Sequence, residues 1–248
     1  MAPTSRSNPA SASADARPQL AERNRMLRSL PGAVYAQILP HLDPFDAPAR
    51  FILWQPDAPI RTVYFPRSCV VSHIVPLEGE VGVEAATVGR EGFVGVPIVL
   101  GADSSATRTL VQVPGELAQL PVSVLREVQS HGSELTTMLL RYALALYEQT
   151  AQSVACIGQH SLEERCARWL LMTHDRVSGD EFMLTQDYLA AMLGVRRASV
   201  NVAASMLQRA GFITYRRGRI TIIDRAGLEG SACGCYDAVR RAYERLLD

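Results

Sequence analysis

The chain has 248 residues, of which 48% are hydrophobic and 20% charged, as is ordinary for a globular protein of one large domain or two small ones. The formal net charge is zero. A protein that coats nucleic acid without specificity is thereby excluded, and any contact with DNA must be local. No run of 18 apolar residues occurs, which excludes a transmembrane helix, and we expect no secretory signal.

The cysteines and the arginines limit the chemistry further. All 25 basic residues are arginine, so every contact made by a Lys or Arg side chain is made by a planar guanidinium group with several N–H donors. The odd number of widely spaced cysteines does not fit a disulfide framework and favours a reducing, cytoplasmic location. Cys233 and Cys235 supply two thiolates, which make an incomplete metal site. We therefore interpret the cysteines as packing residues and predict no metal site. They are Cys69, Cys156, Cys166, Cys233 and Cys235.

The first half of the chain contains three segments that differ in composition and in hydrophobic periodicity. Residues 1–19 consist mainly of Ala, Ser and Pro and predict a disordered tail. Residues 20–42 carry apolar side chains at helical spacing. From about residue 50 to 120, short apolar runs alternate with Gly and Pro, which is typical of a β-sandwich or barrel. An acidic group within it, Glu78, Glu80 and Glu84, is interpreted as a solvated face.

A long helical pattern follows between Val122 and Ile157. It predicts either one long helix or a short helix followed by a long one. A long helix with an apolar seam after a β-domain favours a dimer interface, and the alternative is a helix packed on its own domain. The predicted interface residues are Leu135, Met138, Leu139, Tyr142, Ala145, Leu146 and Gln149.

Residues 161–223 contain the pattern that is most informative about function. Ser161 to Glu164 reads as a capping box that opens a helix. The segment LTQDYLAAMLGVRRASVNVAASMLQRA (184–210) then places Ala190, Gly194 and Val200 at the spacing of a helix-turn-helix. Two short strands meeting at Arg217-Gly218 form the wing of a winged helix. Seven arginines and two acids lie between residues 185 and 225, so positive charge is concentrated there.

This arrangement resembles the Crp/Fnr family of bacterial transcription regulators. The likeness covers roughly residues 25–225 and is most specific in LTQDYLAAMLGVRRASVNVAASMLQRAGFITYRRGRITI and in VYFPRSCVVSHIV followed by VGREGFVG. It implies an α+β fold in which an N-terminal β-roll sensor of the jelly-roll, cyclic-nucleotide-binding type precedes a long dimerisation helix and a C-terminal winged helix-turn-helix. The corresponding segments are 1–19 (tail), 20–121 (β-roll), 122–158 (dimerisation helix), 159–225 (DNA-binding domain) and 226–248 (helical extension).

The resemblance also implies a set of DNA-contacting residues. The family's base-reading positions fall on Arg197, Ala198 and Asn201, and Ser199 matches a phosphate-contacting hydroxyl. Ala198 and Val202 replace the usual acidic and second arginine readers, so the half-site should differ from the common one. Arg197 can pair with guanine and Asn201 with adenine. The predicted DNA-binding residues are Thr185, Gln186, Arg196, Arg197, Ala198, Ser199, Asn201, Arg216, Arg217 and Arg219.

The effector of the sensor domain is less clearly indicated. Family members that bind cyclic nucleotides neutralise the phosphate with an Arg beside a Ser or Thr, and the Glu of a Gly-Glu pair holds the ribose hydroxyl. Here Glu91, Arg108, Thr109 and Thr150 resemble such a pocket, but the cassette is degenerate, so we expect another effector or none. No Cys precedes Cys69, which argues against the family's N-terminal iron–sulfur cluster. Haem binding stays an open alternative, since five histidines could serve as axial ligands. They are His41, His73, His131, His160 and His174.

The predicted function is a homodimeric, sequence-specific transcription regulator that reads a palindromic operator and responds to an effector or redox signal. It would contact double-stranded DNA, a second copy of itself and, if it activates transcription, RNA polymerase, but no membrane. The alternative is a ligand-binding signalling module whose winged helix contacts protein. No enzyme motif is present. The extension 226–248 should pack on the DNA-binding domain or contact another protein.

Overall fold

The computed structural model describes residues 23–78, 82–130 and 134–247. The predicted tail and Glu80 lie outside these residues. Two helical turns open the described chain, α1 (Arg25–Arg28) and α2 (Gly32–Ile38), followed by the 3-10 turn η3 (Leu39–His41). The helical pattern predicted over 20–42 is therefore broken, because Pro31 and Pro40 interrupt it.

The N-terminal β-domain, predicted to be the sensor and called the sensor domain below, is built from two antiparallel sheets. One has the order β1-β7-β3, and the other has the order β2-β6-β4-β5. Their strands are β1 (Asp43–Ala47), β2 (Ile52–Trp54), β3 (Thr62–Pro66), β4 (Val70–Val75), β5 (Val83–Val88), β6 (Arg108–Val113) and β7 (Gly115–Pro121). Sequence periodicity missed β1 and β7. The first is a polar edge strand that contains Pro44, which is tolerated at a sheet edge.

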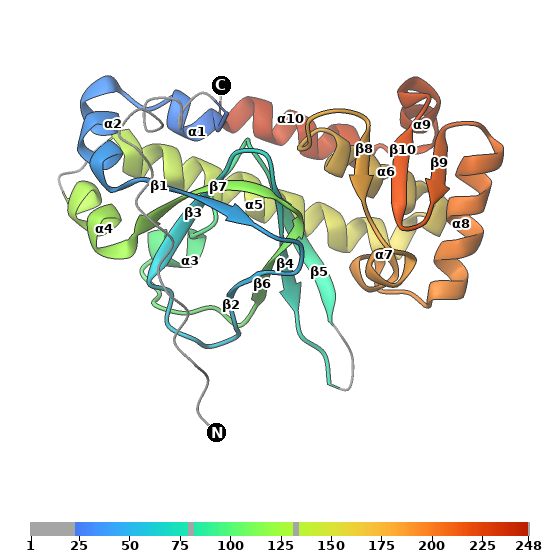
Figure 1. Ribbon diagram of the computed structural model, residues 1–248, viewed down its shortest axis with the longest axis horizontal. Coiled ribbons are helices and arrows are strands. Elements are labelled where there is room, and N and C mark those ends of the chain that lie inside the picture. The colour runs from blue at the N-terminus through green and yellow to red at the C-terminus, as the bar shows by residue number, and fades with distance from the viewer. Residues whose placement is uncertain (1–22, 79–81, 131–133, 248) are drawn as a thin grey trace.

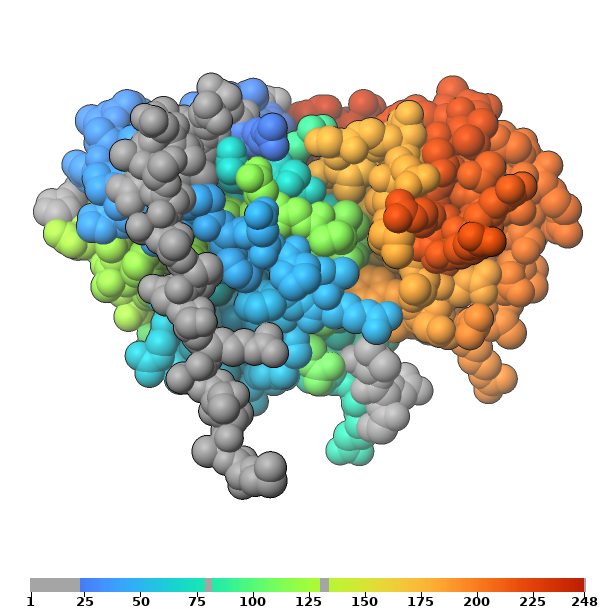
Figure 2. Space-filling model, viewed as in Figure 1, coloured from blue at the N-terminus to red at the C-terminus, as the bar shows by residue number. Residues whose placement is uncertain are grey.

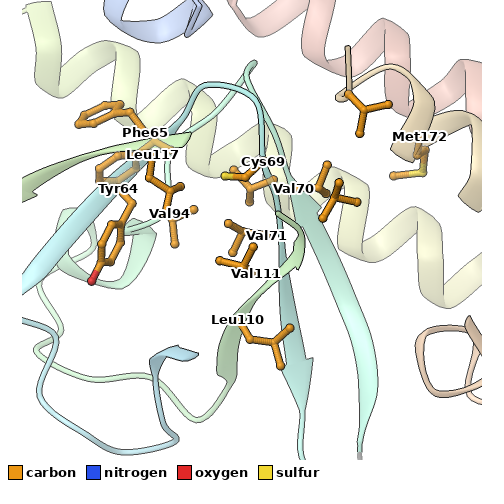
Figure 3. Close-up of a cluster of buried hydrophobic side chains, with 14 of the residues drawn as sticks. Tyr64, Phe65, Cys69, Val70, Val71, Val94, Leu110, Val111, Leu117 and Met172 are labelled. Carbon is orange, nitrogen blue, oxygen red and sulfur yellow. The ribbon is translucent and has the colours of Figure 1, made fainter. Parts of the chain in front are cut away.

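The core of the sensor domain lies between the two sheets. Strand β4 lies between β6 and β5 in its sheet and is buried over five of its six residues. Figure 3 shows the side chains that gather there, together with Met172 from a helix of the next domain. Those of the strands are Tyr64, Phe65, Val70, Val71, Leu110, Val111 and Leu117.

The short helix α3 (Val96–Val99) lies between β5 and β6. Two further helices follow the last strand of the β-domain. They are α4 (Val122–Ser130) and the 26-residue α5 (Glu134–Gln159), so the short-then-long alternative is confirmed. The predicted interface seam on α5 points into its own chain, since Leu139, Tyr142 and Gln149 are fully buried. Leu135 and Ala145 are buried as well, and Met138 and Leu146 pack against the same core. The prediction that this seam meets a second copy is therefore wrong.

The C-terminal helix covers part of α5. The winged domain consists of α6 (Leu162–His174), β8 (Glu181–Met183), α7 (Gln186–Leu193), α8 (Arg197–Arg209), β9 (Ile213–Arg216), β10 (Arg219–Ile222) and α9 (Arg225–Ser231). After it, α10 (Cys235–Leu247) returns along α5, where Arg245 binds Glu148 at 2.6 Å. The extension was predicted to pack on the DNA-binding domain, but its main partner is the long helix.

The two domains contact each other directly. Figure 2 shows the winged domain against one end of the sensor domain. Among the described residues, no helix combines the length and the apolar character needed to cross a membrane.

Candidate DNA-binding site and its link to the sensor domain

The helix-turn-helix forms because its ends are encoded locally. The Thr185 hydroxyl accepts from the backbone N–H of Tyr188 at 3.2 Å and caps α7. Gly194 ends α7 in the left-handed region, with φ 63° and ψ 41°, where a residue with a Cβ is strained. The backbone then re-enters a helix at Arg197. A sharp turn between two short helices is thus specified by one capping hydroxyl and one glycine.

Helix α8 buries one face and exposes the other. Val200, Ala203 and Leu207 pack inward against α6 and α7. The predicted readers Arg197, Ala198 and Asn201 lie on the exposed face, as does Ser199. The helix lies at the outer end of the molecule, so that face is open to solvent (Figure 1).

The exposed polar side chains are held weakly. Arg197 Nη1 lies 3.3 Å from Asp187, and both side chains are more than three-fifths exposed. Gln186 Nε2 donates to Asn201 Oδ1 at 3.1 Å. Exposed pairs of this kind contribute about 0–1 kcal/mol, so a ligand can displace them at little cost.

The wing presents further arginines. Arg217 and Gly218 both have positive φ, 51° and 75°, as the favoured two-residue hairpin turn requires. Arg219 binds Glu181 at 2.7 Å, whereas Arg196, Arg216 and Arg217 have no ion pair within the part of the chain that the structure describes. All of these arginines are exposed. The ten predicted DNA-binding residues thus lie on two neighbouring elements and the start of α7.

The four predicted effector residues do not line one pocket. Glu91 forms an ion pair at 2.8 Å with Arg176 of the segment after α6. Thr109 is bonded to the buried His73 at 2.8 Å, and burial lowers the pKa of that imidazole to about 4. Arg108 donates to Gln55, and the Thr150 hydroxyl donates to the Leu146 carbonyl. Of the four, only Glu91 lines the large cavity described next.

That cavity has a volume of about 890 Å³ and lies where the N-terminal helix, the two domains and α10 meet. Sequence reasoning missed it, because its walls come from six separate segments. Its charged lining is strongly basic, with Glu91, Asp175 and Glu244 as the acids. The lining arginines are Arg23, Arg25, Arg28, Arg67, Arg90, Arg176, Arg225 and Arg240.

Arg176 joins the segments around this cavity. It is 6% exposed, and besides Glu91 it binds the Met172 carbonyl at 2.7 Å and Gln149 Oε1 at 3.2 Å. Its guanidinium also lies 6.0 Å from the ring centroid of Tyr243. Burial lowers the pKa of the guanidinium, but the charge of Glu91, its hydrogen bond and the nearby Tyr243 and Asp175 together outweigh that effect and raise the pKa above its ordinary value. The guanidinium of Arg176 therefore stays protonated.

A second link runs through Glu84 on β5, which was predicted to be solvated but is half-buried. Its carboxyl group accepts from Trp169 Nε1 of α6 at 2.7 Å and lies 2.6 Å from Ser72 Oγ. The same Ser72 hydroxyl lies 2.8 Å from Gln112 Oε1. One hydroxyl proton cannot serve two acceptors, whereas a proton on Glu84 lets Glu84 donate to Ser72 and Ser72 donate to Gln112. Burial accordingly raises the pKa of Glu84 to about 7.

The histidines considered for haem are dispersed. His73 is buried beside Thr109, and His174 binds Asp180 and Arg225. His131 lies outside the described residues. His160 is different, because it joins Cys156, Cys233 and Cys235 in one compact group. Sequence reasoning considered only the two C-terminal thiols, whereas the structure also brings Cys156 and His160 of α5 to the same place.

Comparison with known proteins identifies the fold. The family model of the Crp-like helix-turn-helix domain matches residues 164–230. FixK2 from Bradyrhizobium japonicum superposes with a TM-score of 0.66 at 16% identity, over 77% of this chain and 98% of that one. A Crp/Fnr-family regulator from Eubacterium rectale gives 0.64 at 16% identity, over 83% and 96%. The c-di-GMP responsive global regulator CLP from Xanthomonas campestris gives 0.57 at 17% identity, over 77% and 99%.

No curated protein matches the sequence. The domain match and the superpositions confirm the predicted resemblance: the chain carries a Crp-like helix-turn-helix domain within the Crp/Fnr fold. They do not test the individual DNA-contacting residues, which stay predictions.

The proton on Glu84 gives a testable pH dependence. Because the folded-state pKa is raised from 4.5 to about 7, the native state loses stability as pH rises through this window. A glutamine at this position would keep both hydrogen bonds without the charge. We expect Glu84→Gln to match the wild type in free energy of unfolding at pH 5 and to exceed it at pH 8 by about 3 kcal/mol. Urea denaturation at both pH values measures this, with Glu78→Gln, at an exposed position, as control. A difference independent of pH contradicts it.

Proposed function

We propose that the protein is a homodimeric transcription regulator that binds a palindromic DNA site through α8 and the wing. The observation that carries this proposal is the exposed face of α8. It combines Arg197 and Asn201 with neighbouring wing arginines in a chain that is neutral overall. The same features give no support to an enzyme. A cytoplasmic location and, for an activator, contact with RNA polymerase belong to the same proposal.

The chemistry of the face fits duplex DNA. The Arg197 fork matches the two acceptors of guanine in the major groove, and the Asn201 amide matches adenine. Thr185 and Gln186 lie at the N-terminus of α7 and Ser199 near that of α8, where helix ends favour phosphate. Arg196, Arg216, Arg217 and Arg219 would supply further phosphate contacts. Ala198 offers only a methyl group, which can contact thymine.

The proposed dimer uses the exposed side of α5 rather than the seam predicted from sequence. Leu140, Leu144, Tyr147, Ala151 and Val154 follow one another at alternating steps of four and three. Leu140 and Leu144 are 47% and 46% exposed, and Tyr147 and Val154 are 69% and 68% exposed. A stripe of this period is the contact pattern of two helices in a coiled coil. Two copies joined there would present two recognition helices to successive major grooves.

We also place the effector in the arginine-lined cavity, where it would be an anion. A ligand there would touch both domains and α10 at once. The CLP regulator is described as responsive to c-di-GMP, a phosphodiester, which is the class of ligand that this lining suits.

The proposal is tested by selecting random duplex DNA with the purified protein at moderate salt, with and without anionic ligands. Enrichment of a two-fold symmetric sequence is the expected outcome. If no sequence is enriched and no salt-dependent DNA binding is found under any condition, the winged helix contacts protein instead.

Two arginines should affect DNA binding differently. Arg197→Ala should cost about 1–3 kcal/mol at one base position and relax specificity there. Arg217→Ala should weaken binding to all sequences and lower the slope of log affinity against log salt by about 1. Fluorescence anisotropy on the selected site and on a scrambled duplex measures both. Arg126→Ala, on α4, is the control, and equal losses from all three variants would contradict the assigned face.

A charge in the exposed stripe should dissociate the dimer. Leu144→Glu places a carboxylate between two apolar seams, while the fold of the monomer stays intact because Leu144 faces solvent there. Sedimentation velocity should show the wild type as a dimer and the variant as a monomer. Leu100→Glu changes an equally apolar, 65% exposed residue outside the helix and should remain dimeric. A dimeric Leu144→Glu protein would refute the interface.

Anion binding in the cavity should be visible as stabilisation. Pyrophosphate, cyclic AMP and cyclic di-GMP serve as probes, and a ligand at 100 times its Kd should add about 2.7 kcal/mol to the free energy of unfolding. Arg28→Glu, at the cavity wall, should abolish the gain, and Arg126→Glu should keep it. If every probe stabilises the two variants equally, the anion binds elsewhere.

A further inference from the structure

Four potential metal ligands meet where α5 ends and α10 begins. Cys156 and His160 are one helical turn apart, and the backbone N–H of His160 donates to the Cys156 carbonyl at 3.0 Å. Cys233 and Cys235 lie at the turn between α9 and α10. The three sulfur atoms and one imidazole nitrogen all lie within 4.8 Å of one another. Two segments that lie far apart in the chain are thus brought to a single point.

The spacing of these atoms fits a tetrahedral ion. Cys156 Sγ lies 3.5 Å from Cys233 Sγ, and Cys235 Sγ lies 3.5 Å from His160 Nδ1. A tetrahedral zinc with bonds of about 2.3 Å to sulfur and about 2.0 Å to nitrogen has ligand–ligand edges of about 3.5–3.8 Å. Two edges of the group already have this length, and none of the others exceeds 4.8 Å.

Ordinary core packing does not explain the group. Cys156, Cys233 and Cys235 form a buried cluster of their own, separate from the aliphatic and aromatic core. Elsewhere in the described chain a buried cysteine packs among hydrocarbon side chains, as Cys69 and Cys166 do. Burial, followed by the neighbouring Cys156, raises the pKa of the Cys233 thiol to about 12, so a metal would have to replace the thiol protons.

The surroundings supply donors to sulfur. Gln152 Nε2 donates to Cys235 Sγ at 3.0 Å, and the backbone N–H of Cys235 donates to Cys233 Sγ. Arg168 is nearly buried beside Cys156 and is held by Ser153 Oγ at 3.0 Å. Three thiolates, one neutral imidazole and Zn²⁺ leave a single negative charge, which this guanidinium balances. Such outer partners orient ligands and stabilise their deprotonated forms.

We propose that Cys156, His160, Cys233 and Cys235 bind one Zn²⁺ in a closed, structural site. As the ion binds, each of the three thiols releases its proton to solvent, and four protein ligands leave no open coordination position. The site ties the end of α5 to the start of α10 and so fixes the C-terminal helix along the long helix.

The experiment uses the full chain. Protein purified without chelator is analysed for metal, and reduced, metal-free protein is titrated anaerobically with Co²⁺. We expect one zinc per chain and a Co²⁺ complex with thiolate charge-transfer and tetrahedral ligand-field absorption. Removal of zinc should lower the Tm. Failure of folded, reduced protein to take up Co²⁺ would overturn the proposal.

Variants locate the ligands. His160 lies at the partly exposed edge of the group, so the His160→Gln variant should fold. His160→Gln and Cys235→Ser should each weaken Co²⁺ binding by at least about 100-fold, which is the upper end of the loss when an outer-shell partner is removed. Cys166→Ala removes a buried thiol outside the group and should bind Co²⁺ as the wild type does. Undiminished affinity in His160→Gln and Cys235→Ser refutes the assignment. An iron–sulfur cluster, or a Cys156–Cys233 disulfide in metal-free protein as isolated, also overturns it.

Discussion

The buried guanidinium of Arg176 is the contact on which the arrangement of the two domains depends. It follows α6, the first helix of the winged domain, yet its partners are Glu91 of the sensor domain, Gln149 of α5 and Tyr243 of α10. Leaving such a charge buried without its partner would cost about 3–5 kcal/mol. Gly89 is part of the same arrangement, because a Cβ there would lie 2.4 Å from the Arg176 side chain. The winged domain is therefore held against the sensor domain by a buried guanidinium that needs Glu91 as its partner.

This dependence explains why the degenerate cassette is hard to interpret from sequence. Glu91 was interpreted as a remnant of a ribose-binding glutamate, but its carboxylate accepts from Arg176 and from the backbone N–H of Gly89. The carboxylate of Glu91 is therefore occupied by contacts within the chain. The arginines that line the cavity belong to six segments, and no spacing along the sequence indicates that they converge.

How far sequence reasoning reached depends on how local each feature is. The helix-turn-helix, its Thr185 cap, the Gly194 turn and the wing are specified by neighbouring residues, and the fold and family resemblance followed from them. Helix α5 shows the limit. It carries one apolar stripe through Leu139 and Tyr142 and another through Leu140 and Leu144, and periodicity alone cannot tell which faces the core. Only the position of α10 and the β-roll decides it.

The same contacts indicate how a ligand could change DNA binding. The sensor and winged domains are joined through Glu91–Arg176 and Glu84–Trp169, and also through Gln112, which donates to Thr173 at 3.2 Å. An anion in the cavity would compete with Glu91 for Arg176, so it would bind more tightly to a state in which that ion pair is open. A ligand shifts a conformational equilibrium only by such a difference in affinity. Because Arg176 directly follows α6, and α6 packs on α8, opening this pair would move the recognition helix relative to its copy in the proposed dimer.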